Sequence, residues 1–199
     1  MTKLYLMRHG QTLFNTQGRV QGACDSPLTE VGIKEALLAK TYFEQEDIVF
    51  DKVYSSTQER ATDTAKLIVD QNVYQLKGLK EMNFGTFEAQ PEYLLPKHRE
   101  GASSFEDLLV PYGGEDIRQV GKRLKVEMQK QVVKEKEDGV ILMVSHGAAM
   151  WGLCLELGIT FPPGVFFTNC SICEFDYDAG QFTLKKLVQP TNNFKSYHF

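Results

Sequence analysis

The chain lacks an excess of positive charge and any long hydrophobic run, and each absence excludes a class of protein. Its 199 residues include 22 lysines and arginines against 26 acidic residues, a formal net charge of −4. Nucleic-acid surfaces need clustered excess lysine and arginine, so we expect no nucleic-acid partner. No run of about 18 apolar residues occurs, so we expect no membrane partner. The first predicted strand begins almost at residue 1, which leaves no room for a signal peptide, and we expect a cytoplasmic location.

Cysteine is scarce as well, and its four positions show no disulfide framework for a chain of this length. Cys170 and Cys173 form a C-x-x-C pair, but residues 166–175 have the composition of a strand. Residues three apart on a strand point to opposite faces and cannot share a metal or a disulfide. No second Cys or His pair completes a zinc site, and no carboxylate cluster suits Mg²⁺. We therefore expect no metal and no cofactor.

Apolar runs alternate with amphipathic stretches along the first half of the chain, which predicts an α/β fold with a largely parallel sheet. The length fits one domain, residues 1–199. Ile33, Ala36, Leu37 and Phe43 are expected to form the buried face of the first long helix. The polar tail after Pro190 is expected to be loosely held. The predicted strands cover 3–7, 50–55, 73–76, 140–144, 170–177 and 181–188, and the predicted helices 29–45, 57–70, 117–132 and 148–157.

Residues 85–114 show no sustained period and are interrupted by prolines and glycines. This pattern predicts an insertion of short helices, a small cap over the edge of the sheet where ligands bind. Its only basic cluster is Lys97-His98-Arg99, which either contacts a second anionic group or faces water.

Two of the four histidines follow predicted strands and precede a glycine, His9 in Arg8-His9-Gly10 and His146 in Ser145-His146-Gly147. Open α/β sheets bind ligands at the carboxyl ends of their strands, so both histidines are expected at one site. Arg8 has the shape to hold phosphate or carboxylate oxygens through two hydrogen bonds. Arg60 lies in the first turn of a predicted helix, where the backbone also favours an anion. These residues predict an oxyanion site.

Nearly the whole chain resembles the histidine phosphatase superfamily, the phosphoglycerate mutase-like family. The resemblance implies a three-layer α/β/α fold with a mostly parallel central sheet. The matching segments occur in the family's order: Leu6-Met7-Arg8-His9-Gly10-Gln11-Thr12, Asn15, Arg19-Val20-Gln21-Gly22, Asp25-Ser26-Pro27-Leu28-Thr29, Gly32, Ser55-Ser56, Glu59-Arg60-Ala61, Leu79-Lys80-Glu81, Gly85, Gly113-Gly114-Glu115 and Val144-Ser145-His146-Gly147.

The resemblance also implies roles for individual residues. His9 becomes the nucleophile that forms a phosphohistidine, within a phosphate pocket completed by Arg8, Arg60 and a protonated His146. Glu81 gives a proton to the leaving alkoxide, and its apolar neighbours favour the protonated acid. The substrate-binding residues expected on these grounds are Arg8, Asn15, Gln21, Gly22, Arg60 and His146.

Within this family, hydrolases and mutases differ at the loop that holds the acid. Cofactor-dependent phosphoglycerate mutases carry Glu-Arg-His-Tyr-Gly there, whereas this chain has Glu81-Met82-Asn83-Phe84-Gly85 and lacks both cationic residues. The departure favours a metal-independent phosphatase acting on small phosphomonoesters such as sugar phosphates or phosphoglycerate. A phosphoglycerate mutase and a non-catalytic protein that binds phosphorylated ligands are the alternatives. The particular substrate and the oligomeric state stay open.

Overall fold

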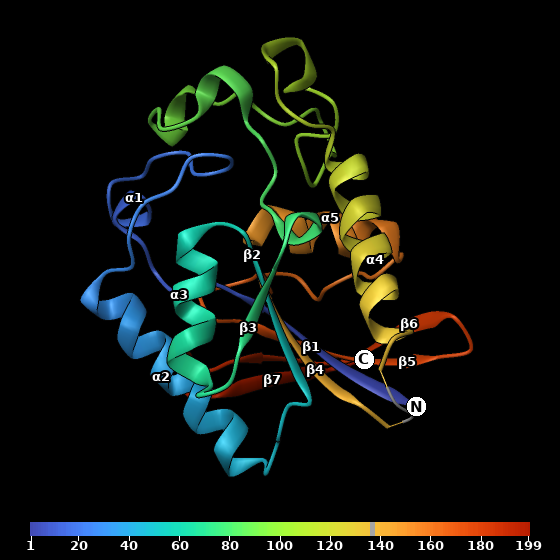
Figure 1. Ribbon diagram of the computed structural model, residues 1–199. Helices are drawn as coiled ribbons and strands as arrows, with labels where there is room; N and C mark the ends of the chain where they lie inside the picture. The colour runs from blue at the N-terminus through green and yellow to red at the C-terminus, as the bar shows by residue number, and fades with distance from the viewer. Residues whose placement is uncertain (136–137) are drawn as a thin grey trace.

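A mixed sheet forms the centre of the computed structural model, which describes residues 1–135 and 138–199 (Figure 1). Within these residues, seven strands are ordered β3-β2-β4-β1-β5-β6-β7. The first four in that order pair in parallel, and the last three pair antiparallel, so the parallel core has an antiparallel extension. The strands are β1 (Thr2–Arg8), β2 (Lys52–Ser56), β3 (Val73–Leu76), β4 (Val140–Ser145), β5 (Ile172–Asp178), β6 (Gln181–Gln189) and β7 (Lys195–His198).

Helices cover both faces of the sheet. Along β1, Leu4 and Leu6 pack into the core beneath α4 and α5, while Tyr5 and Met7 pack into the core beneath α2 and α3. Alternate residues of a strand point to opposite faces, so an uninterrupted apolar run of this kind is typical of a strand whose two faces are both buried. The helices are α1 (Leu13–Thr16), α2 (Glu30–Gln45), α3 (Glu59–Ile68), α4 (Ile117–Val132) and α5 (Gly147–Glu156).

Helix α2 begins at the predicted N-cap, where the Thr29 side chain accepts a hydrogen bond from the Gly32 N–H. The predicted buried face is half wrong, because Ile33 and Leu37 are 38% and 45% exposed. Ala36 and Phe43 are buried as predicted, and Gly32, Ala39 and Tyr42 complete the buried face. Close packing sets this choice, since even a Cβ atom on Gly32 would overlap the backbone of residue 11.

The C-terminal part differs from the prediction in two places. The tail after Pro190 is held by β7, which pairs with β6 from Lys195 to His198. The strand expected over residues 166–175 begins only at Ile172, because Cys170 has a left-handed backbone with φ of 58°. Cys170 and Cys173 nevertheless pack into opposite cores of the sheet, as the strand argument required.

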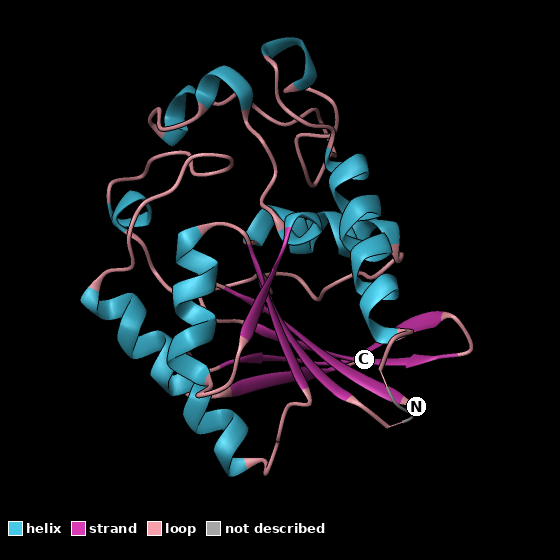
Figure 2. Cartoon of the chain, viewed as in Figure 1, coloured by secondary structure: helices cyan, strands magenta, loops and turns pink. Residues whose placement is uncertain are grey.

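Residues 85–114 form loops and three short 3-10 helices, η2 (Gly85–Phe87), η3 (Glu92–Leu94) and η4 (Val110–Tyr112). A further 3-10 turn, η1 (Lys77–Leu79), precedes them. Figure 2 shows this stretch, largely drawn as loop, arching over the upper end of the molecule. None of the described helices is long and apolar enough to cross a membrane.

Candidate active site

The two histidines meet because their strands are neighbours in register. Strands β1 and β4 pair in parallel with Arg8 level with Ser145, so the next residue of each strand is His9 or His146. The His9 N–H donates to the Ser145 carbonyl at 3.1 Å. The two imidazole rings lie 5.1 Å apart between centroids. Both histidines therefore lie at the carboxyl edge of the parallel sheet.

The hydrogen bonds of His9 define which ring nitrogen carries its lone pair. Its Nδ1 lies 2.7 Å from the Gly10 carbonyl oxygen, which can only accept, so Nδ1 carries the proton. Its Nε2 accepts from Nε of Arg60 at 3.3 Å. Burial, followed by the charges of Arg60 and Arg8, holds the pKa of His9 well below its ordinary value. The imidazole is therefore neutral at neutral pH, and Nε2 can act as a nucleophile once its contact with Arg60 is released.

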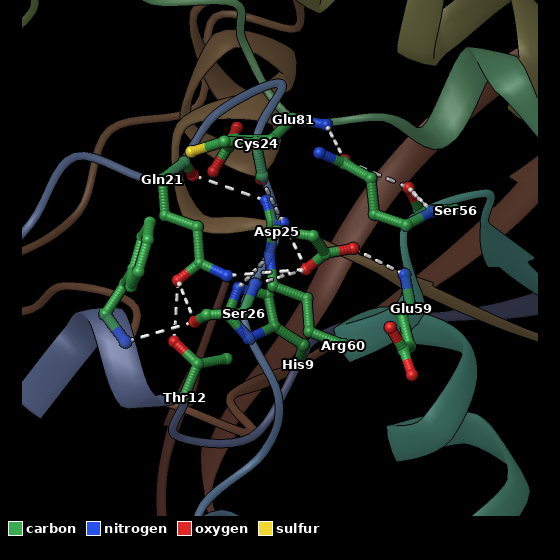
Figure 3. Close-up of polar contacts among 12 residues, drawn as sticks. His9, Thr12, Gln21, Cys24, Asp25, Ser26, Ser56, Glu59, Arg60 and Glu81 are labelled. Carbon is green, nitrogen blue, oxygen red and sulfur yellow. Dashed lines mark hydrogen bonds and ion pairs between the residues drawn. The ribbon is translucent and has the colours of Figure 1, made fainter. Parts of the chain in front are cut away.

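Arg60 is completely buried and connects His9 to the loop after α1 (Figure 3). Its Nη1 donates to the Asp25 carboxylate at 2.8 Å and to the Cys24 carbonyl at 3.0 Å. Its Nη2 donates to the carbonyls of Gln21 and Gly22. Only Nε faces His9, so the guanidinium brings positive charge to the site while most of its donors hold the loop.

Arg8 lines the same pocket from the end of β1. Its Nη1 donates to the Phe167 carbonyl at 2.7 Å, which fixes the guanidinium. Its Nε is buried and has no partner among the described residues. Gly147 lies against it, and a Cβ atom there would be 3.4 Å from that nitrogen. The arginine thus keeps donors unused by the protein beside His9.

The His146 ring lies beside the His9 ring, with centroids 5.1 Å apart. The ring is completely buried, and neither ring nitrogen has a partner within the described part of the chain. Burial, together with the charges of Arg60 and the other basic groups, holds its pKa well below the ordinary value. Burial is the main cause of this shift, which favours a neutral ring in the protein without ligand. The protonated His146 expected at a phosphate-bound site stays a prediction.

Glu81 lines the same pocket and is 8% exposed. Its Oε1 accepts from the N–H groups of Met82 at 2.8 Å and Ala149 at 2.7 Å, and its Oε2 accepts from Ala148 at 3.1 Å. Burial raises the pKa of this carboxyl, although those hydrogen bonds and Arg60 act in the opposite direction. The raised pKa agrees with the expectation drawn from its apolar neighbours and suits a proton donor.

Gln58 was missed by the sequence argument. It lies just before α3 with 5% exposure, and its Oε1 accepts from the Glu81 N–H at 2.9 Å. Its Nε2 donates to the Gly22 carbonyl. This one side chain joins the acid loop to the loop held by Arg60. A glutamine at a helix start is usually solvated, so no local signal marks it.

The remaining predicted ligands are used partly inside the protein. Asn15 and Gln21 line the pocket, but the Gln21 amide also bonds Thr12 and Asp25. The Gly22 N–H donates to Glu88 at 3.1 Å, one of four N–H groups that this carboxylate accepts. Substrate binding by Gly22 stays a prediction that requires this contact to break. Glu88 was not expected from the sequence.

The pocket has a volume of about 810 Å³ and extends from His9 to residues 92–98. Lys97 and His98 line it, whereas Arg99 pairs with Glu106 and Asp107. Among residues 1–135 and 138–199, no three His, Cys, Asp or Glu side chains are grouped so that they could hold a metal ion.

Fold and site together define an α/β protein in which a histidine, an arginine and a carboxyl group line one pocket at the end of the parallel strands. A sequence profile of the histidine phosphatase superfamily (branch 1) matches residues 4–190, and the chain belongs to this superfamily. The phosphoglycerate mutase-like α/β/α fold expected from the sequence is confirmed.

Similar proteins include both mutases and phosphatases. The probable phosphoglycerate mutase GpmB of Yersinia pestis is 31% identical over 189 residues, which cover 89% of this chain and 86% of that protein. A phosphoglycerate mutase structure from Bacillus anthracis superimposes with a TM-score of 0.78 at 30% identity, over 92% and 91% of the two chains. A phosphoserine phosphatase from Entamoeba histolytica, in complex with 3-phosphoglyceric acid, has a TM-score of 0.72 at 30% identity, over 92% and 95%.

Proposed function

We propose that the protein is a metal-independent phosphatase that hydrolyses small phosphomonoesters through a phosphohistidine on His9. The observation that carries the proposal is the pairing of a neutral His9 with a Glu81 of raised pKa on the wall of one pocket. A nucleophile and an acid are the two groups that displacement of an alkoxide from phosphorus requires.

The reaction follows in two steps. Nε2 of His9 attacks phosphorus, the phosphorus–oxygen bond to the alcohol breaks, and the Glu81 carboxyl gives its proton to the departing oxygen. In the second step the Glu81 carboxylate takes a proton from water as that water attacks phosphorus, which releases phosphate and returns His9 and Glu81 to their starting states. Each displacement is easier than a single direct attack by water.

Positive charge around His9 stabilises both displacements. The transferring phosphoryl group spreads charge over three oxygens, so donors fixed in advance lower the barrier. Arg8 offers unused donors in the pocket, and Nε of Arg60 lies 3.3 Å from the attacking nitrogen. A phosphate dianion beside His146 would raise the pKa of that ring and add a further positive charge.

Two features support hydrolysis over mutase activity. The acid loop contains no cationic side chain, and its Met82 is completely buried. The pocket is large enough to admit water together with a small substrate. The similarity to a phosphoserine phosphatase is consistent with this choice.

A phosphoglycerate mutase is the second candidate. Lys97 and His98 line the outer pocket, where a cation could hold a substrate carboxylate. Two of the similar proteins described above are named as phosphoglycerate mutases, one of them as probable.

Product identity tests the proposal. The protein and its His9→Ala variant are incubated with 3-phosphoglycerate, sugar phosphates and nitrophenyl phosphate, without added metal and with chelator. We expect phosphate release that falls by about 10⁴-fold or more in the variant. Conversion of 3- to 2-phosphoglycerate with little free phosphate would establish the mutase instead. Tight binding of these esters without any turnover would establish a binding protein.

A further inference from the structure

The geometry points to a second subsite, an apolar recess beside Glu81 that binds a hydrocarbon or aryl part of the substrate's leaving alcohol. The inference rests on the proposed function and names its substrate class: phosphomonoesters of bulky apolar alcohols. The recess has a volume of about 310 Å³, and its main walls are Met82, Phe105, Ile117, Ala148, Trp151 and Phe166.

The recess adjoins the catalytic pocket and shares part of its wall with it. Phe105, Ala148 and Trp151 line both spaces, as does His98. Ala148 is also the residue whose N–H donates to Oε2 of Glu81. The alcohol oxygen must lie next to the Glu81 carboxyl to receive its proton, so the group attached to that oxygen begins beside this shared wall.

The chemistry of the wall selects an apolar group. Ser103, Ser104 and His98 are the only polar residues among those that line the recess in the described chain. Phe105 is held edge-to-face by Phe84 and His98, with centroids 6.1 Å and 4.5 Å away. A sugar or glycerate hydroxyl placed against the apolar walls would lose hydrogen bonds to water, whereas a methylene group gains from burial.

Attraction of a substrate carboxylate to the cations of the outer pocket is weaker than the preference of the recess for apolar groups. Lys97 and His98 are exposed, so water screens their attraction for a substrate carboxylate. Burial of several methylene groups favours binding more strongly than one such solvated ion pair. The recess therefore separates this chain's preferred substrates from small polar phosphate esters.

A series of n-alkyl phosphates from ethyl to octyl tests the subsite, because the leaving alcohols differ in length and hardly in reactivity. We expect kcat/KM to rise by about fourfold per methylene until the recess is full. Two variants alter the recess outside the reacting groups. Ser103→Trp places a large side chain at the exposed wall, and Phe166→Ala removes a wall residue that is 62% exposed. Both should flatten the chain-length dependence while ethyl phosphate turnover stays within about twofold.

Ser196→Trp, an exposed site on β7, is the matched control and should retain the full dependence. A wild-type enzyme with His9-dependent turnover but no chain-length dependence would overturn the subsite and leave the phosphatase intact. Calorimetry with ethyl- and octylphosphonate, which cannot be hydrolysed, measures the subsite without turnover. Equal affinities for the two would overturn it. Tighter octylphosphonate binding in an inactive protein would retain the subsite and reject the phosphatase.

Discussion

The pocket has two ends that are built in different ways. At the phosphorus end, Arg60 makes four hydrogen bonds to the loop over residues 21–25 and a fifth to His9, and Glu81 accepts three. At the leaving-group end, η3 is a single 3-10 turn, and Tyr93 is 84% exposed. Buried hydrogen bonds hold a group in one geometry, whereas a solvated side chain keeps many accessible conformations.

The contrast separates reactivity from selectivity. Phosphoryl transfer depends on positioned charge, which the strand ends and helix starts supply. Choice of alcohol depends on the walls of the outer pocket and of the apolar recess, which residues 92–105 and the first turns of α4 and α5 help to form. Substitutions at the phosphorus end should therefore affect every substrate, and substitutions at the other end should affect some substrates only.

The largest expected effect concerns the acid, where the two ends meet. Glu81→Gln should lower kcat by about 10²- to 10⁴-fold on alkyl phosphates and much less on nitrophenyl phosphate, whose leaving group needs no proton. Because burial raises the pKa of Glu81, its acid form persists to higher pH, and wild-type turnover of alkyl phosphates should fall as pH rises through that pKa. This decrease in turnover at high pH should be absent from the pH profile of the Glu81→Gln variant. Equal losses on both esters would contradict the acid role.

A smaller loss is expected at Arg8, where charge is kept and shape is changed. Arg8→Lys should lower kcat/KM by about 10²-fold on every substrate, because an ammonium cannot bond the Phe167 carbonyl and two phosphate oxygens in the same fork. Arg99→Lys, outside the pocket lining and half-exposed, is the control and should leave kinetics unchanged. A loss of kcat/KM confined to the phosphate esters of one class of alcohol would contradict the separate roles of the two ends of the pocket.

Gln58 tests whether buried hydrogen bonds hold the phosphorus end. Gln58→Leu leaves the Glu81 N–H without its partner, so the free energy of unfolding should fall by about 1–3 kcal/mol in urea titrations. Turnover of alkyl phosphates should fall about tenfold, because the loop that holds Glu81 loses the hydrogen bond from its backbone to Gln58. The pH at which turnover declines should also shift. Gln119→Leu, exposed on α4, is the control. Lower stability with an unchanged pH profile would reduce Gln58 to a purely structural role.

The smallest effect is expected at the leaving-group end. Lys97→Ala should raise the KM for 3-phosphoglycerate by less than about fivefold, since an exposed cation contributes little. The difference should shrink further in concentrated salt and be absent with alkyl phosphates. A loss many times larger, confined to phosphoglycerate, would favour the mutase.

Local sequence patterns were sufficient to predict most of the helices and strands. Thr29 caps α2 where predicted, and β4 and α5 lie within a residue or two of their expected bounds. The errors occur where contacts are distant in sequence. Pairing of β7 with β6 holds a tail whose own composition is polar, and packing against the backbone of residue 11 determines which face of α2 is buried. The hydrophobic periodicity of a single segment does not indicate either of these long-range contacts.

The sequence by itself determined which residues come to the site. A strand followed by His-Gly is a local pattern, and parallel pairing places both such strand ends at one edge, so His9 and His146 had to meet. Only the tertiary structure decided their state. The neutral rings, the raised pKa of Glu81, the loop held by Arg60 and the apolar recess all arise from burial between segments far apart in the chain. Desolvation and charge proximity depend on those distances, and a linear sequence does not contain them.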